Sequence, residues 1–417
     1  MSRQARAQRG VDLALLAIVV SLLALGILSV YGASYAAAQR LVGDPTYFFS
    51  RQLIWALIGV VAMIVAASID YSIWRQLAIP IMILALILLV LVLIIGEERF
   101  GARRTLLHGR VQPSELAKIA VIIYIAAWLA SREKVLRDVR LGLIPFAVLL
   151  GLITLLIVAE PDISTSAVII ATAMTMFFIA GADLKQVGIA ITVMAITFAL
   201  LVTQSGYARD RVMAFWDFWQ GSGHDSEKTY HTNLAIRMLM QGGWIGAGGP
   251  GASQLDPQAQ IPLSWSDAIL AIVGRDMGLI GTLLILGLFA GLMYRGFRIA
   301  LHADDNFGTL LASGVTFWLV FQAIINVAVI TAIIPFTGMP LPFISYGGSS
   351  MLAAMTGIGL LLSVSRGTRW KGEDLARLAF GRRDWGPRLS GARGRSRATR
   401  RSPRRNARSR KPRTKEA

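Results

Sequence analysis

The sequence contains no cysteine and few charged residues. Without cysteine it has no disulfide and no thiolate ligand for a metal ion. Asp, Glu, Lys and Arg make up only 16% of its 417 residues, whereas hydrophobic residues make up 55% and the mean hydropathy is +0.58. Soluble globular domains carry about 25% charged residues. This imbalance indicates a protein embedded in lipid.

Acidic residues are scarcer than basic ones, and the excess positive charge lies at one end of the chain. The formal net charge is +18, and residues 366–417 hold 19 Lys/Arg against 4 Asp/Glu, so this segment supplies 15 of the 18 charges. The hydrophobic body is close to neutral, which argues against nucleic acid as a partner. The Arg-, Ser- and Pro-rich tail is predicted to be disordered after about residue 381, where it contacts solvent, anionic membrane lipid or a cytosolic partner.

Ten apolar runs are long enough to cross a bilayer. Every backbone N–H and C=O must be satisfied inside lipid, so such runs form helices, and the lack of period-two alternation excludes a barrel. The first run has the length of a span rather than of a cleaved signal peptide. The predicted fold is an all-α, polytopic integral membrane protein with an N-terminus at 1–11, a membrane domain at 12–365 and a tail at 366–417. The spans are predicted at 12–34, 51–69, 74–95, 115–131, 141–158, 163–180, 186–204, 267–294, 309–333 and 350–365.

The longest connection between these spans covers residues 204–266, between the seventh and eighth helices. It contains aromatic residues such as Phe215, Trp216 and Trp219, which are uncommon in disordered linkers. Long connections inside compact proteins are usually functional or disordered. This loop is therefore predicted to be partly ordered.

Basic residues predict that both termini lie in the cytoplasm of a bacterial cell, because cytoplasmic loops carry an excess of Lys and Arg. An even number of spans is consistent with this orientation. Some arginines would then face outward against the trend, and either an anionic ligand or anionic lipid headgroups would explain them. These outward arginines include Arg103, Arg104, Arg209 and Arg211.

Three polar motifs fall at the outer ends of predicted helices. Pro113-Ser114-Glu115 is typical of a helix start, with Ser114 as a cap and with Lys118 placed to form an ion pair with Glu115 on the same helix face. Glu160-Pro161-Asp162 has a proline with acids beside it, which is typical of the first turn of a helix, and Asp267 suits a helix N-cap. The alternative for Asp267 is a base at the membrane surface. A glycine run at 242–251 offers backbone N–H groups for a phosphate, although it matches no nucleotide-binding fingerprint.

The linker before the last span carries the most specific signal. Three prolines and three glycines between Ile334 and Gly348 forbid continuous helix there. Residues Pro335–Ser350 match the pattern Pro-x-Thr-Gly-x-Pro-Leu-Pro-x-x-Ser-Tyr-Gly-Gly-Ser-Ser, and the chain thereby resembles the SEDS family of peptidoglycan glycosyltransferases. Further matches are Gly-Ala-Arg-Arg at 101–104, Gln-Pro-Ser-Glu-Leu-Ala-Lys at 112–118, Pro-Asp at 161–162, and Gln322 with Asn326.

The resemblance implies an inner-membrane enzyme that polymerises lipid II into glycan strands outside the membrane, with a class B penicillin-binding protein and other divisome proteins as partners. It implies inverting transfer, in which Asp267 removes a proton from the acceptor sugar. The arginines would neutralise the diphosphate leaving group. The substrate-binding residues carried over are Arg103, Arg104, Glu115, Lys118, Asp162, Arg209, Arg211, Gln322, Asn326, Thr337, Ser345, Tyr346, Ser349 and Ser350.

The sequence departs from the family pattern beside Asp267. Leu263 stands where the family has Glu and Trp265 where it has His, so two candidate ligands for a divalent cation are missing. Asp256, in a short insertion, offers another carboxylate. No cofactor is assigned, and a divalent cation such as Mg²⁺ or Mn²⁺ stays an open candidate.

Two other functions compete with the polymerase. A lipid II flippase would use the broken backbone before the last helix, but its polar residues should then lie at several depths of the bilayer. Glu115, Lys118, Asp162 and Asp267 are all predicted near one face, which favours the enzyme. A scaffold of weak activity would explain the altered residues near Asp267. Within the family, Gly-Ala-Arg-Arg, the Tyr207–Arg211 segment and the basic tail favour the division type over the elongation type.

Overall fold

A computed structural model describes the part of the chain that carries the predicted membrane domain. It covers residues 10–99, 102–106, 111–132, 136, 138–160, 162–204, 206–221, 230–248 and 266–367. Contacts divide the chain into Met1–Arg369 and Trp370–Ala417, and all of the described residues belong to the first unit. The tail predicted to be disordered lies outside the described residues.

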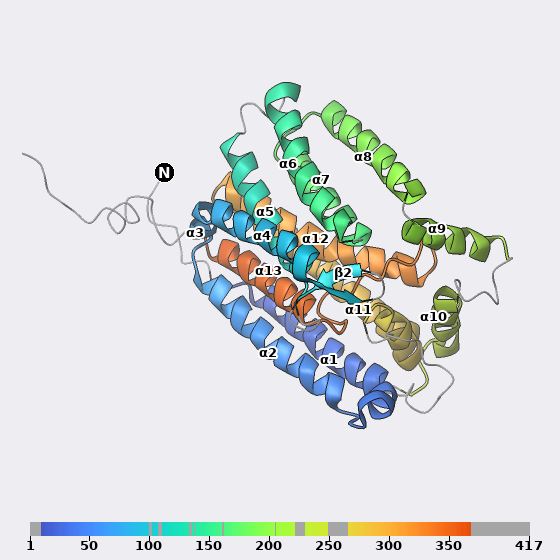
Figure 1. The fold of residues 1–417 in the computed structure, drawn as a ribbon. Coiled ribbons are helices and arrows are strands. Elements are labelled where there is room, and N and C mark those ends of the chain that lie inside the picture. Colours follow the sequence, from blue (N-terminus) through green and yellow to red (C-terminus); the bar gives the residue numbers. More distant parts are fainter. Residues whose placement is uncertain are drawn as a thin grey trace, which may run out of the picture. The chain divides into compact units, whose positions relative to one another are not determined.

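The described part is built almost entirely of helices that pack side by side (Figure 1). The helices are α1 Leu13–Val42, α2 Tyr47–Ser68, α3 Tyr71–Gln76, α4 Ala78–Ile95, α5 Pro113–Ser131, η2 Val139–Leu143, α6 Ile144–Ala159, α7 Ile163–Ile179, α8 Leu184–Gln204, α9 Gly206–Trp219, α10 Tyr230–Gly242, α11 Ile269–Leu301, α12 Asn306–Ile330 and α13 Gly348–Arg366. One short hairpin joins β1 Glu97–Arg99 to β2 Ala102–Thr105.

Length and composition allow eight of the described helical segments to cross a membrane, and α7 and the Leu184–Val193 part of α8 are shorter apolar helices. The predicted all-helical, polytopic fold is confirmed. The first helix runs beyond its predicted end at residue 34 and stops at Val42. No glycine or proline occurs between residue 34 and Gly43, which ends the helix in the left-handed conformation with φ 77°.

Buried and exposed side chains divide the helices into two groups. Most of α5, α12 and α13 is buried, whereas α1, α2, α4 and α6 expose large aliphatic side chains along much of their length. In a bundle of membrane-spanning helices those exposed faces contact lipid tails, because no water is present there to penalise them. Buried polar side chains inside the bundle include Glu115 and Lys118 of α5 and Gln322 and Asn326 of α12.

Hydrogen bonds and ion pairs define the two ends of the bundle. At one end, Asp12 before α1 pairs with Arg295 of α11, and the Ser363 hydroxyl donates to the Ile69 carbonyl after α2. At the other end, the Gln52 side chain of α2 donates to the Ser345 carbonyl in the linker between α12 and α13. We call this second end the site end, because the polar motifs of the sequence gather there.

The loop at residues 204–266 contains two described helices, α9 and α10. Glycines at and after the end of α10 pack against the backbone of α11: a methyl group on Gly242, the last residue of α10, would lie 1.9 Å from the Gly274 carbonyl oxygen. Gly246 approaches Gly278, where α11 is interrupted by a left-handed residue with φ 67°. The described part of this glycine run is therefore used for close helix packing, and residues 249–251 lie outside the described part.

Candidate functional site

Asp267 does not cap a helix, which removes the simplest structural role for it. The N-cap of α11 is Ala268, and no side chain bonds to the backbone there. The Asp267 carboxylate instead accepts a hydrogen bond of 2.7 Å from the Ser266 hydroxyl. Its side chain is partly buried at the site end, directly before the helix starts.

The linker between α12 and α13 lies directly against this carboxylate. Gly338 has φ 71°, and a methyl group placed on it would lie 3.2 Å from Asp267 Oδ2 and 3.9 Å from a terminal nitrogen of Arg211. Asn326 of α12 joins the two segments, because its side-chain amide donates to the carbonyls of Asp267 at 3.0 Å and Met339 at 2.8 Å. Glycine at 338 thus permits both the left-handed turn and the close approach of the linker to Asp267.

Burial raises the pKa of Asp267 to about 6, since an ionised carboxylate loses solvation there. The hydrogen bond from Ser266 and the positive charges of Arg211 and Arg104 oppose this increase, and the negative charge of Asp162 adds to it. The net result is a carboxyl group that is mostly ionised at neutral pH yet takes up a proton more readily than an exposed Asp. Such a group is suited to general base chemistry.

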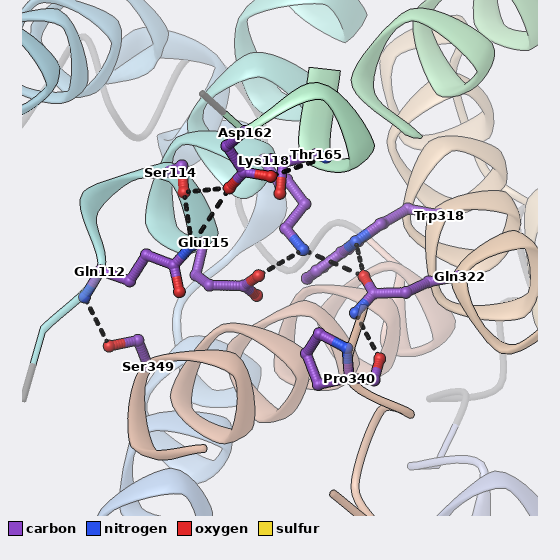
Figure 2. A network of polar contacts seen from close by, with 10 residues as sticks. All are labelled: Gln112, Ser114, Glu115, Lys118, Asp162, Thr165, Trp318, Gln322, Pro340 and Ser349. Carbon is purple, nitrogen blue, oxygen red and sulfur yellow. Dashed lines mark hydrogen bonds and ion pairs between the residues drawn. The ribbon is translucent and has the colours of Figure 1, made fainter. Parts of the chain in front are cut away.

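Asp162 joins the starts of α5 and α7 at the site end (Figure 2). Its carboxylate caps α7 by accepting from the Thr165 N–H at 3.2 Å, so the helix predicted to open at this segment begins after Asp162. It also accepts from Gln112 at 3.1 Å and from Ser114 at 3.2 Å. Ser114 therefore does not cap α5 as predicted: the N-cap is Gln112, and the Ser114 hydroxyl is turned toward Asp162.

A buried ionic network crosses from α5 to α12 (Figure 2). The predicted ion pair is confirmed, with Lys118 Nζ 2.8 Å from Glu115 Oε1 and the two side chains only 1% and 3% exposed. Lys118 also donates to Gln322 Oε1, which accepts from the Trp318 indole as well. The Gln322 amide then donates to the Pro340 carbonyl at 2.9 Å. The network thus ties the linker to α5.

Glu160, between α6 and α7, has an unusual environment that the sequence did not single out. Its side chain is fully buried, and neither carboxyl oxygen has a hydrogen-bond partner in the described part of the chain. Burial first, and then the nearby charge of Asp162, raise the pKa of Glu160 to about 8, although Arg104 opposes the shift. The Arg104 side chain donates to the Glu160 backbone carbonyl at 3.0 Å. Glu160 is therefore mostly protonated, and neutral, at pH 7.

The raised pKa of Glu160 predicts a specific dependence of stability on pH. An unfolded Glu ionises near its ordinary value of 4.5, whereas the folded protein retains the proton up to about pH 8. Stability should therefore fall as pH rises between these values, by up to about 1.4 kcal/mol per pH unit. Thermal unfolding of purified protein at pH 5.5, 6.5 and 7.5 should show a smaller slope for Glu160→Gln. The exposed Asp44→Asn should keep the wild-type slope, and equal slopes for Glu160→Gln and wild type would contradict this account.

The remaining predicted residues divide by their contacts. Ser345 and Ser349 bond to backbone N–H groups of Leu341 and Gln112, and the Thr337 carbonyl accepts from Ser164, so all three hold the linker in place. Tyr346 makes an edge contact with Phe48 of α2. Arg209 is exposed on α9 and Ser350 is partly buried at the start of α13. The side chain of Arg103 lies outside the described part.

The described residues offer no set of side chains that could bind a metal ion as a cluster. In the described ranges, no three His, Asp or Glu side chains gather as a possible metal cluster. Asp256, Leu263 and Trp265, on which the earlier expectation depended, lie outside the described residues. We therefore assign no chemical step to a metal.

These observations define the class of protein. It is a multi-pass helical membrane protein in which one carboxylate of raised pKa meets arginine side chains at one end of the bundle. The profile of the FtsW/RodA/SpoVE family, described as cell cycle proteins, matches residues 13–370. The chain belongs to this family, which is the SEDS family expected from the sequence, and it is accordingly a multi-pass inner-membrane protein.

Individual relatives agree with this assignment. The chain is 37% identical to the probable peptidoglycan glycosyltransferase FtsW of Trichlorobacter lovleyi, over 86% of this chain and 94% of the relative. It is 35% identical to the stage V sporulation protein E of Bacillus subtilis, over 86% and 98%. A solved structure from work on "structural coordination of polymerization and crosslinking by a peptidoglycan synthase complex" has a TM-score of 0.70 at 26% identity, over 85% and 98%. RodA of Thermus thermophilus, with a TM-score of 0.63 at 24% identity over 85% and 97%, shares the fold.

Proposed function

We propose that this chain is a peptidoglycan glycosyltransferase that polymerises lipid II into glycan strands at the outer face of the inner membrane during septal wall synthesis. The observation that carries the proposal is the Asp267 carboxylate, which lies against Gly338 and beside Arg211 and has its pKa raised to about 6. Relatives named FtsW support the reaction and the division role.

The reaction needs one proton acceptor and a stabilised leaving group. Asp267 takes the proton from the 4-hydroxyl of the acceptor sugar while that oxygen forms a bond to C1 of the donor sugar. The bond from C1 to the diphosphate breaks, and undecaprenyl diphosphate leaves with the electron pair, so the configuration at C1 is inverted. Arg104 and Arg211 lie close enough to Asp267 to influence its pKa, and they are the cations that would neutralise the diphosphate.

The orientation follows from the same proposal. The site end faces the periplasm, both termini are cytoplasmic, and the prenyl chain of the substrate stays in the outer leaflet while its sugars reach Asp267. A class B penicillin-binding protein that cross-links the new strands is the proposed partner, with other divisome proteins around the pair. The crosslinking complex among the solved structures supports this partnership.

The proposal is tested by supplying purified protein, alone and with its cognate penicillin-binding protein, with lipid II in liposomes. Glycan polymer is expected with the partner present, and a parallel reaction with a chelator reports whether a divalent cation is needed. Scrambling of lipid II across the bilayer without polymer would instead favour a flippase. Absence of both activities with every partner tried would favour a scaffold.

The rate of polymerisation should depend on the ionisation of Asp267. A base works only when deprotonated, so activity is expected to rise as pH increases and to reach half its plateau near pH 6, where the raised pKa of Asp267 lies. The measurement is the initial polymerisation rate at saturating lipid II between pH 5 and 8. Ser266→Ala removes the hydrogen bond that lowers this pKa, so its half-point should lie at higher pH. If the half-point of Ser266→Ala equals that of the wild type, the group whose ionisation controls the rate is not Asp267.

A further inference from the structure

Helix α9 divides its side chains among three sides. Val212, Trp216 and Trp219 are spaced by four and three residues and therefore share one side of the helix, and they are 38%, 62% and 62% exposed. Arg209, three residues before Val212, lies at the N-terminal end of the same side, where a long cationic side chain can reach lipid headgroups. Asp210 and Asp217, seven residues apart, share a second, polar side. An apolar stripe next to a charged one is the pattern of a helix that lies in a membrane surface.

The inner side of α9 belongs to the functional site. Arg211 lies near Gly338 and Asp267, and its guanidinium carbon is 6.0 Å from the centre of the Phe336 ring. Phe215 and Phe218 make edge contacts with Trp219. Because these residues share one short helix, a movement of its apolar side also moves Arg211.

Both ends of α9 are held at the level where membrane spans stop. Its first residue, Gly206, follows the last residue of α8 after a single intervening position, and Figure 1 shows α9 turning away from the direction of α8. At the other end, the Trp219 indole donates to the Ala332 carbonyl at 3.1 Å, two residues after the end of α12. Ile333, which follows, is 65% exposed and apolar, as expected for a position in contact with lipid.

We propose that α9 binds the bilayer surface at the site end through Val212, Trp216 and Trp219, and that this contact holds Arg211 beside Asp267. The occupant of the apolar stripe is lipid because the stripe continues the lipid-facing surface of the spans at the level of Ala332. Tryptophan is also the side chain that prefers the boundary between headgroups and acyl chains. The claim that this contact positions Arg211 for catalysis rests on the proposed polymerase function, whereas the claim that α9 contacts lipid does not.

The lipid contact is tested with a fluorescent bimane attached to a single thiol, since the chain has no cysteine of its own. Val212→Cys places the probe on the apolar stripe, and Asp210→Cys is the matched control on the polar side. The protein is placed in nanodiscs of phosphatidylethanolamine and phosphatidylglycerol. The fluorescence of the bimane at position 212 should be quenched by a lipid that carries a nitroxide on carbon 5 of its acyl chain, and it should not be quenched by iodide in the water. The probe at 210 should respond in the opposite way.

Two results would overturn the lipid contact. One is equal quenching of both probes by iodide, which places the stripe in water. The other is iodide quenching of the probe at position 212 that disappears when the penicillin-binding protein is added, because such protection identifies the stripe as a protein interface.

The positional effect is tested by Val212→Asp, which puts a charge into the stripe and should displace α9 from the bilayer. A misplaced catalytic group costs about 10²-fold in rate, so initial polymerisation should fall by about that factor. Asp210→Ala should keep the wild-type rate and thermal stability. If Val212→Asp polymerises normally while nitroxide lipid no longer quenches a probe at Trp216→Cys, on the same stripe, in that background, the effect on Arg211 is wrong. Absence of polymer from the wild-type protein would refute the polymerase instead and leave the quenching result standing.

Discussion

Asp267→Asn is expected to abolish glycan polymerisation while the protein stays folded. Asparagine has nearly the same shape, and its Oδ1 can still accept the hydrogen bond from Ser266, but its amide cannot take up a proton. Removing a positioned base costs about 10²–10⁴ in rate. The measurement is polymer formed from lipid II with the partner present, together with the thermal unfolding midpoint.

Two further variants sharpen this test. Asp44→Asn, an exposed acid in the turn between α1 and α2, should polymerise at the wild-type rate. Asp267→Glu keeps a carboxylate but lengthens it toward Gly338, so it should retain a small part of the activity. Undiminished polymerisation by Asp267→Asn would show that another group accepts the proton.

The sequence predicted the membrane architecture well because lipid imposes a simple rule. A helix that satisfies its own backbone in hydrocarbon needs about 20 apolar residues, and such runs are visible directly. The hairpin of β1 and β2 was not predicted, since it has only three and four residues and carries charged side chains. The helices α9 and α10 were missed for a related reason: each contains both charged and apolar residues and resembles an ordered loop in composition.

The functional site was only partly predictable, because its contacts join residues far apart in the chain. Spacing alone left Asp267 as either an N-cap or a base, and only the position where α11 begins excludes the N-cap. The approach of Gly338 and Arg211 to Asp267 brings together α9, the start of α11 and the linker after α12, which no local pattern records. Glu160 was interpreted only as part of an ordinary helix start, because its burial and its lack of a hydrogen-bond partner in the described part of the chain are properties of the folded protein.

Lys118→Met is expected to destabilise the protein more than any other single substitution considered. It leaves the Glu115 carboxylate buried with no positive partner, and the second oxygen of that carboxylate already has no hydrogen-bond partner in the described part of the chain. Breaking a buried ion pair in this way costs about 3–5 kcal/mol. The midpoint of thermal unfolding in detergent measures the effect. Lys185→Met, at an exposed lysine at the start of α8, is the matched control and should change the midpoint little.

The double variant Glu115→Leu with Lys118→Met distinguishes an effect of the network on protein stability from an effect on the placement of the linker. Replacing a buried ion pair by apolar residues is often neutral, so the unfolding midpoint should return toward that of the wild type. Gln322 would still accept from Trp318 and donate to Pro340, but without Lys118 the linker would no longer be tied to α5. A stable double variant that polymerises slowly therefore means that the network positions the linker, and with it Gly338, against Asp267. A double variant that regains full activity means that the ion pair serves only to neutralise its own buried charges.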